Sequence, residues 1–446
     1  MKKIYTFLLV LSPSFWGIYG QTPPVIPVPD NMVAEGITSI PATVIQEVKP
    51  YTEARAAGLM EWHPAKKEMV ISTRFANVSQ IHYVKMPVGA RRQLTFESEP
   101  ISFATFEPNN GSYLLVGKDI GGNEFAQIYR YSFENGSLTL LTDGGRSQNG
   151  GIEWNKKGDK ILYSSTRRNG ADRDIYRMNP LDPNSDKLLI ELQGGGWAIG
   201  DWSDDESMIV LNEYISVNES RIWLYNNNTG NKTRLLPVQD ERTTYRTVGI
   251  THDKKGLYLL TNKDSEFSRL AYYDFQSKKL NIITPDIKWE ITSADISEDE
   301  QKIAFVTNET GISKLFVMHV KTGKYNQVPA IPTGIIGGME WHKNSLSLGF
   351  TFTTSNSSSD VYEWNTSTNL LTRWTESELG GIDASNIQTP QLIQWKSFDG
   401  LQISGFLYPA DKKFSGKRPV IINIHGGPEG QSRPGFLGHN NFFLQE

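Results

Sequence analysis

The sequence predicts a mainly β protein in which a seven-bladed β-propeller is followed by the incomplete start of an α/β domain. A unit of four short β-forming runs recurs at intervals of 44–48 residues over residues 53–388. This is the size of one four-stranded propeller blade. The 39 glycines and 22 prolines are scattered, as in a β protein with many turns. Residues 389–446 carry a different pattern, which predicts the second domain.

Each repeat is defined by an aromatic or aliphatic anchor, a polar turn, and a β-forming run that begins seven residues after the anchor. The anchors are Trp62, Phe106, Trp154, Trp202, Ile250, Ile296 and Trp341. The residues seven positions later are all apolar: Met69, Tyr113, Ile161, Ile209, Leu257, Ile303 and Leu348. Third and fourth runs follow, such as 127–131 and 138–142. Six or eight blades would require a misread unit, a β-sandwich would not repeat at this period, and the 3.6-residue periodicity of helical repeats is absent.

Several residues within the repeats have both a structural and a functional interpretation. The anchor tryptophans are expected to pack between blades, and the acidic run 204–206 to be a solvated turn. His63, His252 and His342 fall at or near the same turn of three blades, where no close partner and no metal site are expected. The run Gly121-Gly122-Asn123-Glu124 is either a hairpin tip or a loop whose Glu124 carboxylate contacts a substrate amine. No cofactor is predicted.

The N-terminal residues indicate where the protein is located. Residues 1–20 resemble a signal peptide, with two lysines, an apolar run over 4–11 and Gly20 before Gln21. A membrane anchor is the alternative, but the apolar run stops well short of about 20 residues. We therefore expect an exported protein, periplasmic or extracellular, without a membrane span. Residues 21–52 predict a proline-rich arm with a short helix over 42–48.

Composition excludes several other functions. Lys plus Arg number 45 and Asp plus Glu 49, a net charge of −4, which leaves no basic surface for nucleic acid. The chain has no cysteine, which excludes thiol catalysis, cysteine-based zinc sites and lipid attachment through cysteine.

The chemistry-bearing motif lies after the repeats. Residues 392–397 and 401–408 predict a hairpin around the Asp-Gly turn at 399–400. The nearly all-apolar run 419–424 suits a strand buried on both faces of a parallel sheet, and it leads into His425, Gly426, Gly427 and Pro428. A strand followed by His-Gly-Gly is typical of the oxyanion loop of an α/β-hydrolase domain, although taken alone it could be an ordinary turn. Glycines let backbone N–H groups approach the developing negative charge.

These motifs, 397–408 and 423–434, resemble the S9 prolyl-oligopeptidase family of serine peptidases, in which a propeller precedes an α/β-hydrolase domain. The resemblance covers nearly the whole mature chain, and the second motif looks most like the bacterial acylaminoacyl-peptidase and dipeptidyl-peptidase branches. In the prolyl oligopeptidase and dipeptidyl peptidase IV branches a tyrosine stands at the place of His425 and helps bind the oxyanion. The resemblance therefore implies a backbone N–H of Gly426 or Gly427 as the donor here. The Glu-Glu motif by which dipeptidyl peptidase IV relatives hold a substrate N-terminus has no match.

The sequence departs from the family at the catalytic residues. No Gly-x-Ser-x-Gly occurs, and residues 440–446 are expected to begin the first hydrolase helix. The nucleophile, Asp and His of the family are thus absent, so we expect an inactive fragment of a peptidase that would hydrolyse short peptides through an acyl-enzyme. The family also implies that the propeller admits only small peptides. The alternative is a non-catalytic, TolB-like binding propeller, in which residues 390–431 would have no use.

Overall fold

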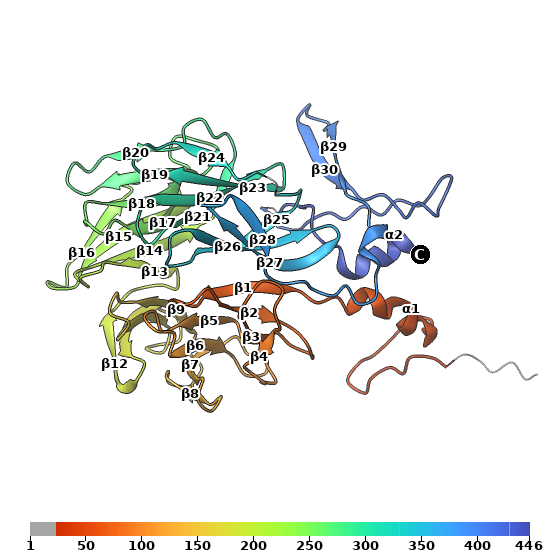
Figure 1. Cartoon of the computed structure of the whole chain (residues 1–446), viewed down its shortest axis with the longest axis horizontal. Coiled ribbons are helices and arrows are strands. Elements are labelled where there is room, and N and C mark those ends of the chain that lie inside the picture. Colours follow the sequence, from red (N-terminus) through yellow and green to blue (C-terminus); the bar gives the residue numbers. More distant parts are fainter. Residues whose placement is uncertain (1–23, 330, 428) are drawn as a thin grey trace, which may run out of the picture.

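The computed structural model describes residues 24–329, 331–427 and 429–446. The expected signal peptide 1–20 and Pro428 lie outside these residues. The described residues form seven four-stranded antiparallel sheets, one two-stranded hairpin and a few short helices (Figure 1). The predicted seven-bladed propeller is confirmed.

Each blade is one sheet whose four strands are consecutive in the chain. Blade 1 contains β1 (Ala57–Trp62), β2 (Met69–Thr73), β3 (Gln80–Val84) and β4 (Arg92–Gln93). Blade 2 contains β5 (Phe103–Phe106), β6 (Tyr113–Lys118), β7 (Gln127–Ser132) and β8 (Leu138–Leu140). Blade 3 contains β9 (Asn149–Trp154), β10 (Ile161–Ser165), β11 (Asp174–Asn179) and β12 (Asp182–Ile190). Blade 4 contains β13 (Trp197–Trp202), β14 (Met208–Ser216), β15 (Glu219–Asn226) and β16 (Lys232–Leu236).

The last three blades follow the same order. Blade 5 contains β17 (Tyr245–Ile250), β18 (Gly256–Thr261), β19 (Arg269–Asp274) and β20 (Leu280–Ile282). Blade 6 contains β21 (Glu290–Ile296), β22 (Lys302–Glu309), β23 (Ile312–His319) and β24 (Tyr325–Gln327). Blade 7 contains β25 (Ile335–Trp341), β26 (Ser347–Thr354), β27 (Ser357–Asn365) and β28 (Leu370–Arg373).

The first strand of each blade is the inner strand, and the predicted anchor is its last residue. Contacts join β1 to β5 and β25, and β17 to β13 and β21, so the inner strands are neighbours around the ring. Trp62 is paired with Met69 and Trp202 with Ile209, the residue seven positions later in each case. Six residues lie between each of these anchors and its antiparallel partner, four of them in the turn itself, and this produces the spacing of seven. The anchors Trp62, Trp202 and Trp341 are buried, as predicted, whereas Trp154 is half-buried.

The ring is closed by side chains, because each sheet uses its own four strands. Between blades 1 and 7, the Leu59 backbone N–H donates to Thr351 Oγ1 at 2.9 Å. The Trp62 and Trp374 rings meet edge to face, with centroids 5.1 Å apart. Lys67 and the buried Glu363 form an ion pair of 2.7 Å. Apolar packing and a few polar contacts therefore carry the closure of the ring.

The region after the blades differs from prediction. The hairpin of β29 (Gln391–Lys396) and β30 (Gln402–Leu407) is confirmed. The predicted strand over 419–424 is wrong: these residues have no regular structure, and Val420, Ile422 and Ile424 are 80%, 79% and 81% exposed. A parallel strand needs hydrogen-bonding neighbours on both sides, and none of the described residues provides them. The short helices η2 (Gly438–Asn441) and α2 (Phe442–Gln445) overlap the helix expected over 440–446.

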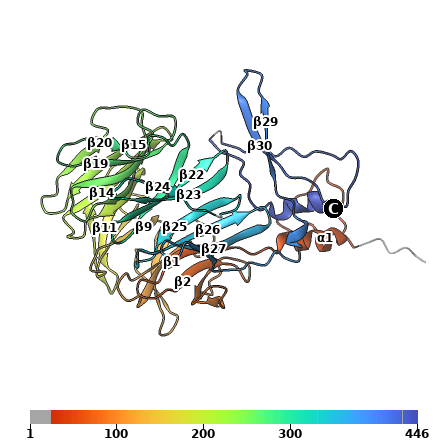
Figure 2. The same ribbon diagram turned by 45° about the horizontal axis from the view of Figure 1, so that its top comes forward.

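The N-terminal arm packs against the end of the chain. Its helix α1 (Thr43–Thr52) is longer than the helix predicted over 42–48 and includes Pro50 in its last turn. Tyr51 is buried with Ile382 and Ile387, and its ring meets Phe442 at 5.6 Å. Packing of this last turn explains why the helix continues past the predicted end. Both views show α1 and α2 side by side at one end of the molecule (Figures 1 and 2). In the parts of the chain that the structure describes, no helix is long and apolar enough to cross a bilayer.

The closure between blades 1 and 7 predicts the effect of removing one anchor. Trp62→Ala should lower the free energy of unfolding by about 3–5 kcal/mol, because a fully packed indole leaves a cavity between two blades. Chemical denaturation measures this change. Trp289→Ala is the control, since Trp289 is 37% exposed and lies outside the anchor positions. Equal, small losses in both variants would show that the anchors do not hold the ring.

Candidate functional site

The two faces of the propeller carry different features. Inner strands end at the anchors, so the turns after the anchors lie on one face, here named the turn face. Loops between second and third strands lie on the opposite face, the loop face. The C-terminal segment rests there: Arg433 donates to the Gly311 carbonyl oxygen and to Ser313 Oγ, each at 2.9 Å. Gln431 Oε1 accepts a hydrogen bond of 2.7 Å from Asn308.

The predicted oxyanion loop belongs to this segment. His425, Gly426 and Gly427 are exposed, and His425 Nδ1 lies 2.9 Å from the carbonyl oxygen of Gly426. Gly427 has φ of +142°, in the region that favours glycine. The fourth predicted residue, Pro428, is outside the described residues. The role of these residues in binding an oxyanion stays a prediction.

Glu124, the candidate substrate contact, lies at the exposed tip of the loop between β6 and β7 on the loop face. Its φ is +64°, and its backbone N–H donates to Asp119 Oδ2 at 2.9 Å. This is the hairpin tip that the sequence allowed. Within the described residues, no hydrogen bond or ion pair joins Glu124 to residues 425–427.

A ring of carboxylates near the centre of the propeller was not foreseen. The residue immediately before the anchor is acidic in five blades, and we call these residues the inner carboxylates: Glu61, Glu153, Asp201, Asp295 and Glu340. Four of them accept the backbone N–H of the anchor in the next blade. The distances are 2.6 Å from Ile250 N to Asp201, 2.8 Å from Trp341 N to Asp295 and 3.3 Å from Trp62 N to Glu340, and Phe106 N donates to Glu61.

The inner carboxylates have unusual proton affinities. Burial raises the pKa of Glu61 and of Glu153 to about 8, in the first case against the hydrogen bonds from Phe106 and Thr105. Burial also raises the pKa of Asp295 to about 6 and that of Asp201. For Glu340, burial and then the charges of Glu61 and Asp295 raise the pKa well above its usual value. Poor hydration therefore favours the protonated forms, and repulsion between inner carboxylates adds to this effect at Glu340 and Glu153.

Glu61 and Glu340 also border a small cavity of about 50 Å³ between blades 1, 2 and 7. Lys343 lines the same cavity, and its ammonium donates a hydrogen bond of 2.6 Å to the Pro108 carbonyl oxygen. A polar cavity of this size has room for ordered water but not for a peptide. This part of the ring is therefore suited to holding blades together, not to binding a substrate.

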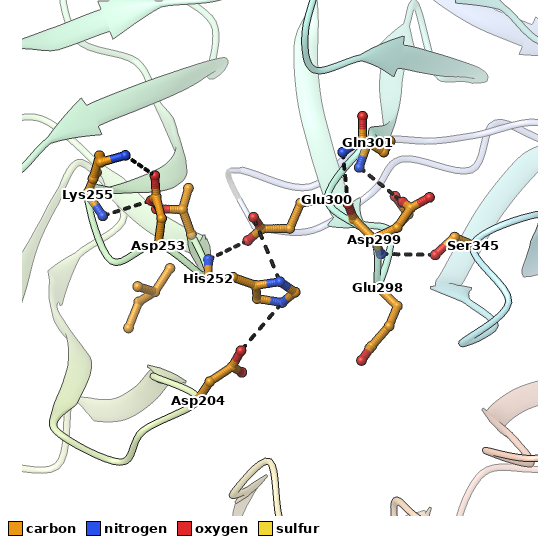
Figure 3. A network of polar contacts seen from close by, with 12 residues as sticks. Asp204, His252, Asp253, Lys255, Glu298, Asp299, Glu300, Gln301 and Ser345 are labelled. Carbon is orange, nitrogen blue, oxygen red and sulfur yellow. Dashed lines mark hydrogen bonds and ion pairs between the residues drawn. The ribbon is translucent and has the colours of Figure 1, made fainter.

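The turn face carries a polar network between blades (Figure 3). His252 lies between Asp204 and Glu300, with ring nitrogens 3.9 Å from a carboxylate oxygen of each, and its backbone N–H donates to Glu300 at 2.7 Å. The prediction that these histidines lack a close partner is wrong for His252 and for His342, whose Nε2 lies 3.0 Å from the Lys66 carbonyl oxygen of blade 1. The sequence missed the His252 contacts because equivalent turns of neighbouring blades are about 48 residues apart in the chain.

The prediction that the acidic run 204–206 is a solvated turn is corrected in part. Glu206 is not simply solvated, since it pairs with Lys160 at 2.9 Å and accepts from Asn155 at 2.8 Å. Asp204 and Asp205 keep side chains that are 42% and 48% exposed, as predicted. In the described part of the chain, no cluster of three or more His, Cys, Asp or Glu side chains could hold a metal ion.

The inner carboxylates predict that stability depends on pH. A carboxyl group whose folded pKa exceeds its unfolded value, about 4.3 for Glu, costs stability as pH rises from that value to the folded pKa. Glu153 accepts no hydrogen bond from the described residues and faces the charge of Asp201. Glu153→Gln should therefore raise the free energy of unfolding at pH 8.5 by about 1–2 kcal/mol and change it little near pH 5.

Denaturation curves between pH 5 and 8.5 measure this dependence. Glu134→Gln, at an exposed loop position, is the matched control and should follow the parent protein. A Glu153→Gln variant that is less stable than the parent at pH 8.5 would contradict the raised pKa.

The comparisons with known proteins agree with this architecture. Residues 101–377 match a family model described as "Prolyl oligopeptidase, N-terminal beta-propeller domain". No curated protein sequence matches the chain. A solved prolyl endopeptidase has a TM-score of 0.71 at 16% identity, over 90% of this chain and 60% of that one.

A second solved structure is similar to the same extent. Prolyl oligopeptidase B from Galerina marginata, bound to a 35-residue hydrolysis and macrocyclization substrate, has a TM-score of 0.73 at 13% identity, over 90% of this chain and 62% of that one. This chain thus spans less than two thirds of the length of either enzyme. At these identities the likeness shows the fold.

Proposed function

Because the chain belongs to the prolyl oligopeptidase N-terminal β-propeller family, we propose that it is the propeller-bearing part of an S9 serine peptidase. The complete enzyme would hydrolyse short peptides through an acyl-enzyme intermediate. The present residues would supply the propeller and the oxyanion loop, and they would be inactive without a nucleophile, Asp and His. We further propose that the protein is exported and that it belongs with the bacterial acylaminoacyl- and dipeptidyl-peptidase-like members.

One observation carries the proposal: a strongly apolar run leads directly into His-Gly-Gly and is exposed to water. Val420, Ile421, Ile422 and Ile424 are 67–81% exposed, and the adjoining hairpin exposes Phe398 and Trp395. Contiguous apolar surface of this kind marks an interface that is covered in the functional protein. The strand pattern of the run matches the sheet of a hydrolase domain, which would cover it.

The position of the segment supports the same proposal. Arg433 and Gln431 hold it on the loop face, where the inner strands begin. A hydrolase domain built onto residues 389–446 would cover this face and place the oxyanion loop over it. A binding propeller of the TolB-like kind would leave the run 419–424 as an unprotected hydrophobic edge.

Reaction with a fluorophosphonate serine probe tests the catalytic part of the proposal. The 446-residue chain should not be labelled under conditions that label an authentic serine peptidase, because it holds no activated serine. The DNA beyond codon 446 is the second measurement. An encoded Gly-x-Ser-x-Gly-Gly in any frame supports the peptidase, whereas labelling of this chain, or unrelated DNA, would contradict the proposal.

The exposed apolar run 419–424 predicts how a charged substitution within it changes self-association and stability. Ile422→Asp should reduce concentration-dependent self-association, measured by light scattering, and leave the melting temperature within about 1 °C, because the side chain is not packed. Val238→Asp is the control, an equally polar change at a position 67% exposed elsewhere on the propeller. A fall of several degrees for Ile422→Asp would show that residue 422 is packed in this chain.

A further inference from the structure

The inner strands bring seven equivalent residues together at the level four positions before the anchors. Six of these residues are small: Gly58, Ser102, Gly150, Ala198, Thr292 and Gly337. The seventh is Arg246, in β17 of blade 5. Ser102, Ala198, Arg246 and Gly337 are exposed although they belong to or adjoin the innermost strands. Exposure at the centre of a ring of inner strands means that these residues face the central channel.

The space beside Arg246 is open. A Cβ added at Gly150 or at Gly337 would meet no atom within 4 Å, so nothing fills the channel at these positions of the ring. Neither glycine has a positive φ, so a close approach of side chains or a left-handed backbone does not explain them. At this level of the channel, six blades therefore carry small residues and the remaining blade carries one long cation.

The Arg246 guanidinium is only partly used by the protein. Its Nη2 donates to the Thr292 carbonyl oxygen in the inner strand of blade 6. A guanidinium has five N–H donors, so most remain available. Among the described residues, no carboxylate forms an ion pair with it. Glu290 acts only at longer range and accepts a hydrogen bond of 3.0 Å from Ser268 N.

The surroundings of Arg246 shift its pKa but leave its guanidinium charged. Burial lowers the pKa of Arg246, and the charge of Glu290 partly offsets this. A guanidinium stays charged despite such a shift, so the positive charge of Arg246 remains available to an anion in the channel. The inner carboxylates lie three residues further along the strands, about 10 Å away, and hold the next blade instead. Arg246 therefore lies nearer the loop face than the inner carboxylates do.

Arg246 is the second residue of β17, and inner strands begin at the loop face. We propose that Arg246 forms a carboxylate-binding subsite in the central channel, which holds the C-terminal carboxylate or an acidic side chain of a peptide. The subsite rests on the proposed peptidase function, since it opens toward the segment that carries His425 to Gly427. Arginine suits a carboxylate because its planar donors make two parallel hydrogen bonds.

Calorimetric titration of the 446-residue chain at low ionic strength tests the subsite with three N-acetylated tripeptides. These are trialanine with a free C-terminus, trialanine amide, and Ala-Asp-Ala amide. The free acid should bind about tenfold more tightly than trialanine amide. Binding of Ala-Asp-Ala amide as tightly as the free acid assigns the subsite to any peptide carboxylate. Weaker binding assigns it to the C-terminus.

Variants separate binding from a structural role. Arg246→Gln should remove the preference for the free acid, and Arg246→Lys should keep part of it, at a melting temperature close to that of the parent protein. Gly150→Val should weaken binding of the free-acid peptide, because the larger side chain narrows the channel while Arg246 itself is unchanged. Arg177→Gln, in the third strand of blade 3, is the matched control and should bind as the parent does.

Equal binding of acid and amide by the parent chain, no binding of either, or a preference that survives in Arg246→Gln would overturn the subsite. None of these results would affect the serine-probe or DNA tests, which decide the proposed function separately.

Discussion

The structure depends on a hydrogen bond between the inner strands of successive blades. An acidic residue before one anchor accepts the backbone N–H of the next anchor, at the joints between blades 1 and 2, 4 and 5, 6 and 7, and 7 and 1. The contact matters most at the last joint, because blades 7 and 1 are not consecutive in the chain and share no strand. A central ring of such contacts fixes the angular position of each blade, while the apolar anchors fill the space between them.

Two of the remaining three joints show how the same position adapts. In blade 2, Thr105 replaces the acid, and its hydroxyl accepts from the Trp154 indole at 3.3 Å. In blade 5 the position is Gly249, where an added Cβ would lie 3.0 Å from Ile296 Cδ1, so apolar packing replaces the polar contact. Crowding five carboxylates near one axis has an electrostatic cost. Burial is the main cause of their raised pKa values, and repulsion by a neighbouring inner carboxylate adds to it at Glu340 and Glu153.

The propeller could be predicted because its signals are local and repeated. An anchor, a turn and a partner strand seven residues later need only nearby residues, so Trp62 and Trp202 were placed correctly. The inner carboxylates occupy one position of the same repeat in five blades, directly before the anchor, but an acidic residue in a strand pattern does not by itself indicate burial. The contacts of His252 with Asp204 and Glu300 arise only when blades pack. The strand predicted over 419–424 failed for a related reason, since its apolar pattern specifies a strand only when neighbouring strands are present.

The central proposal is that residues 419–427, which are unpaired among the described residues, would join the sheet of a hydrolase domain next to the propeller. Hydrogen–deuterium exchange of the 446-residue chain tests it most directly, because backbone amides in a paired strand are protected and those in an unpaired segment are not. The account predicts rapid exchange throughout 419–427, together with strong protection of the inner and second strands of every blade. Protection of 419–427 equal to that of β26 would contradict it.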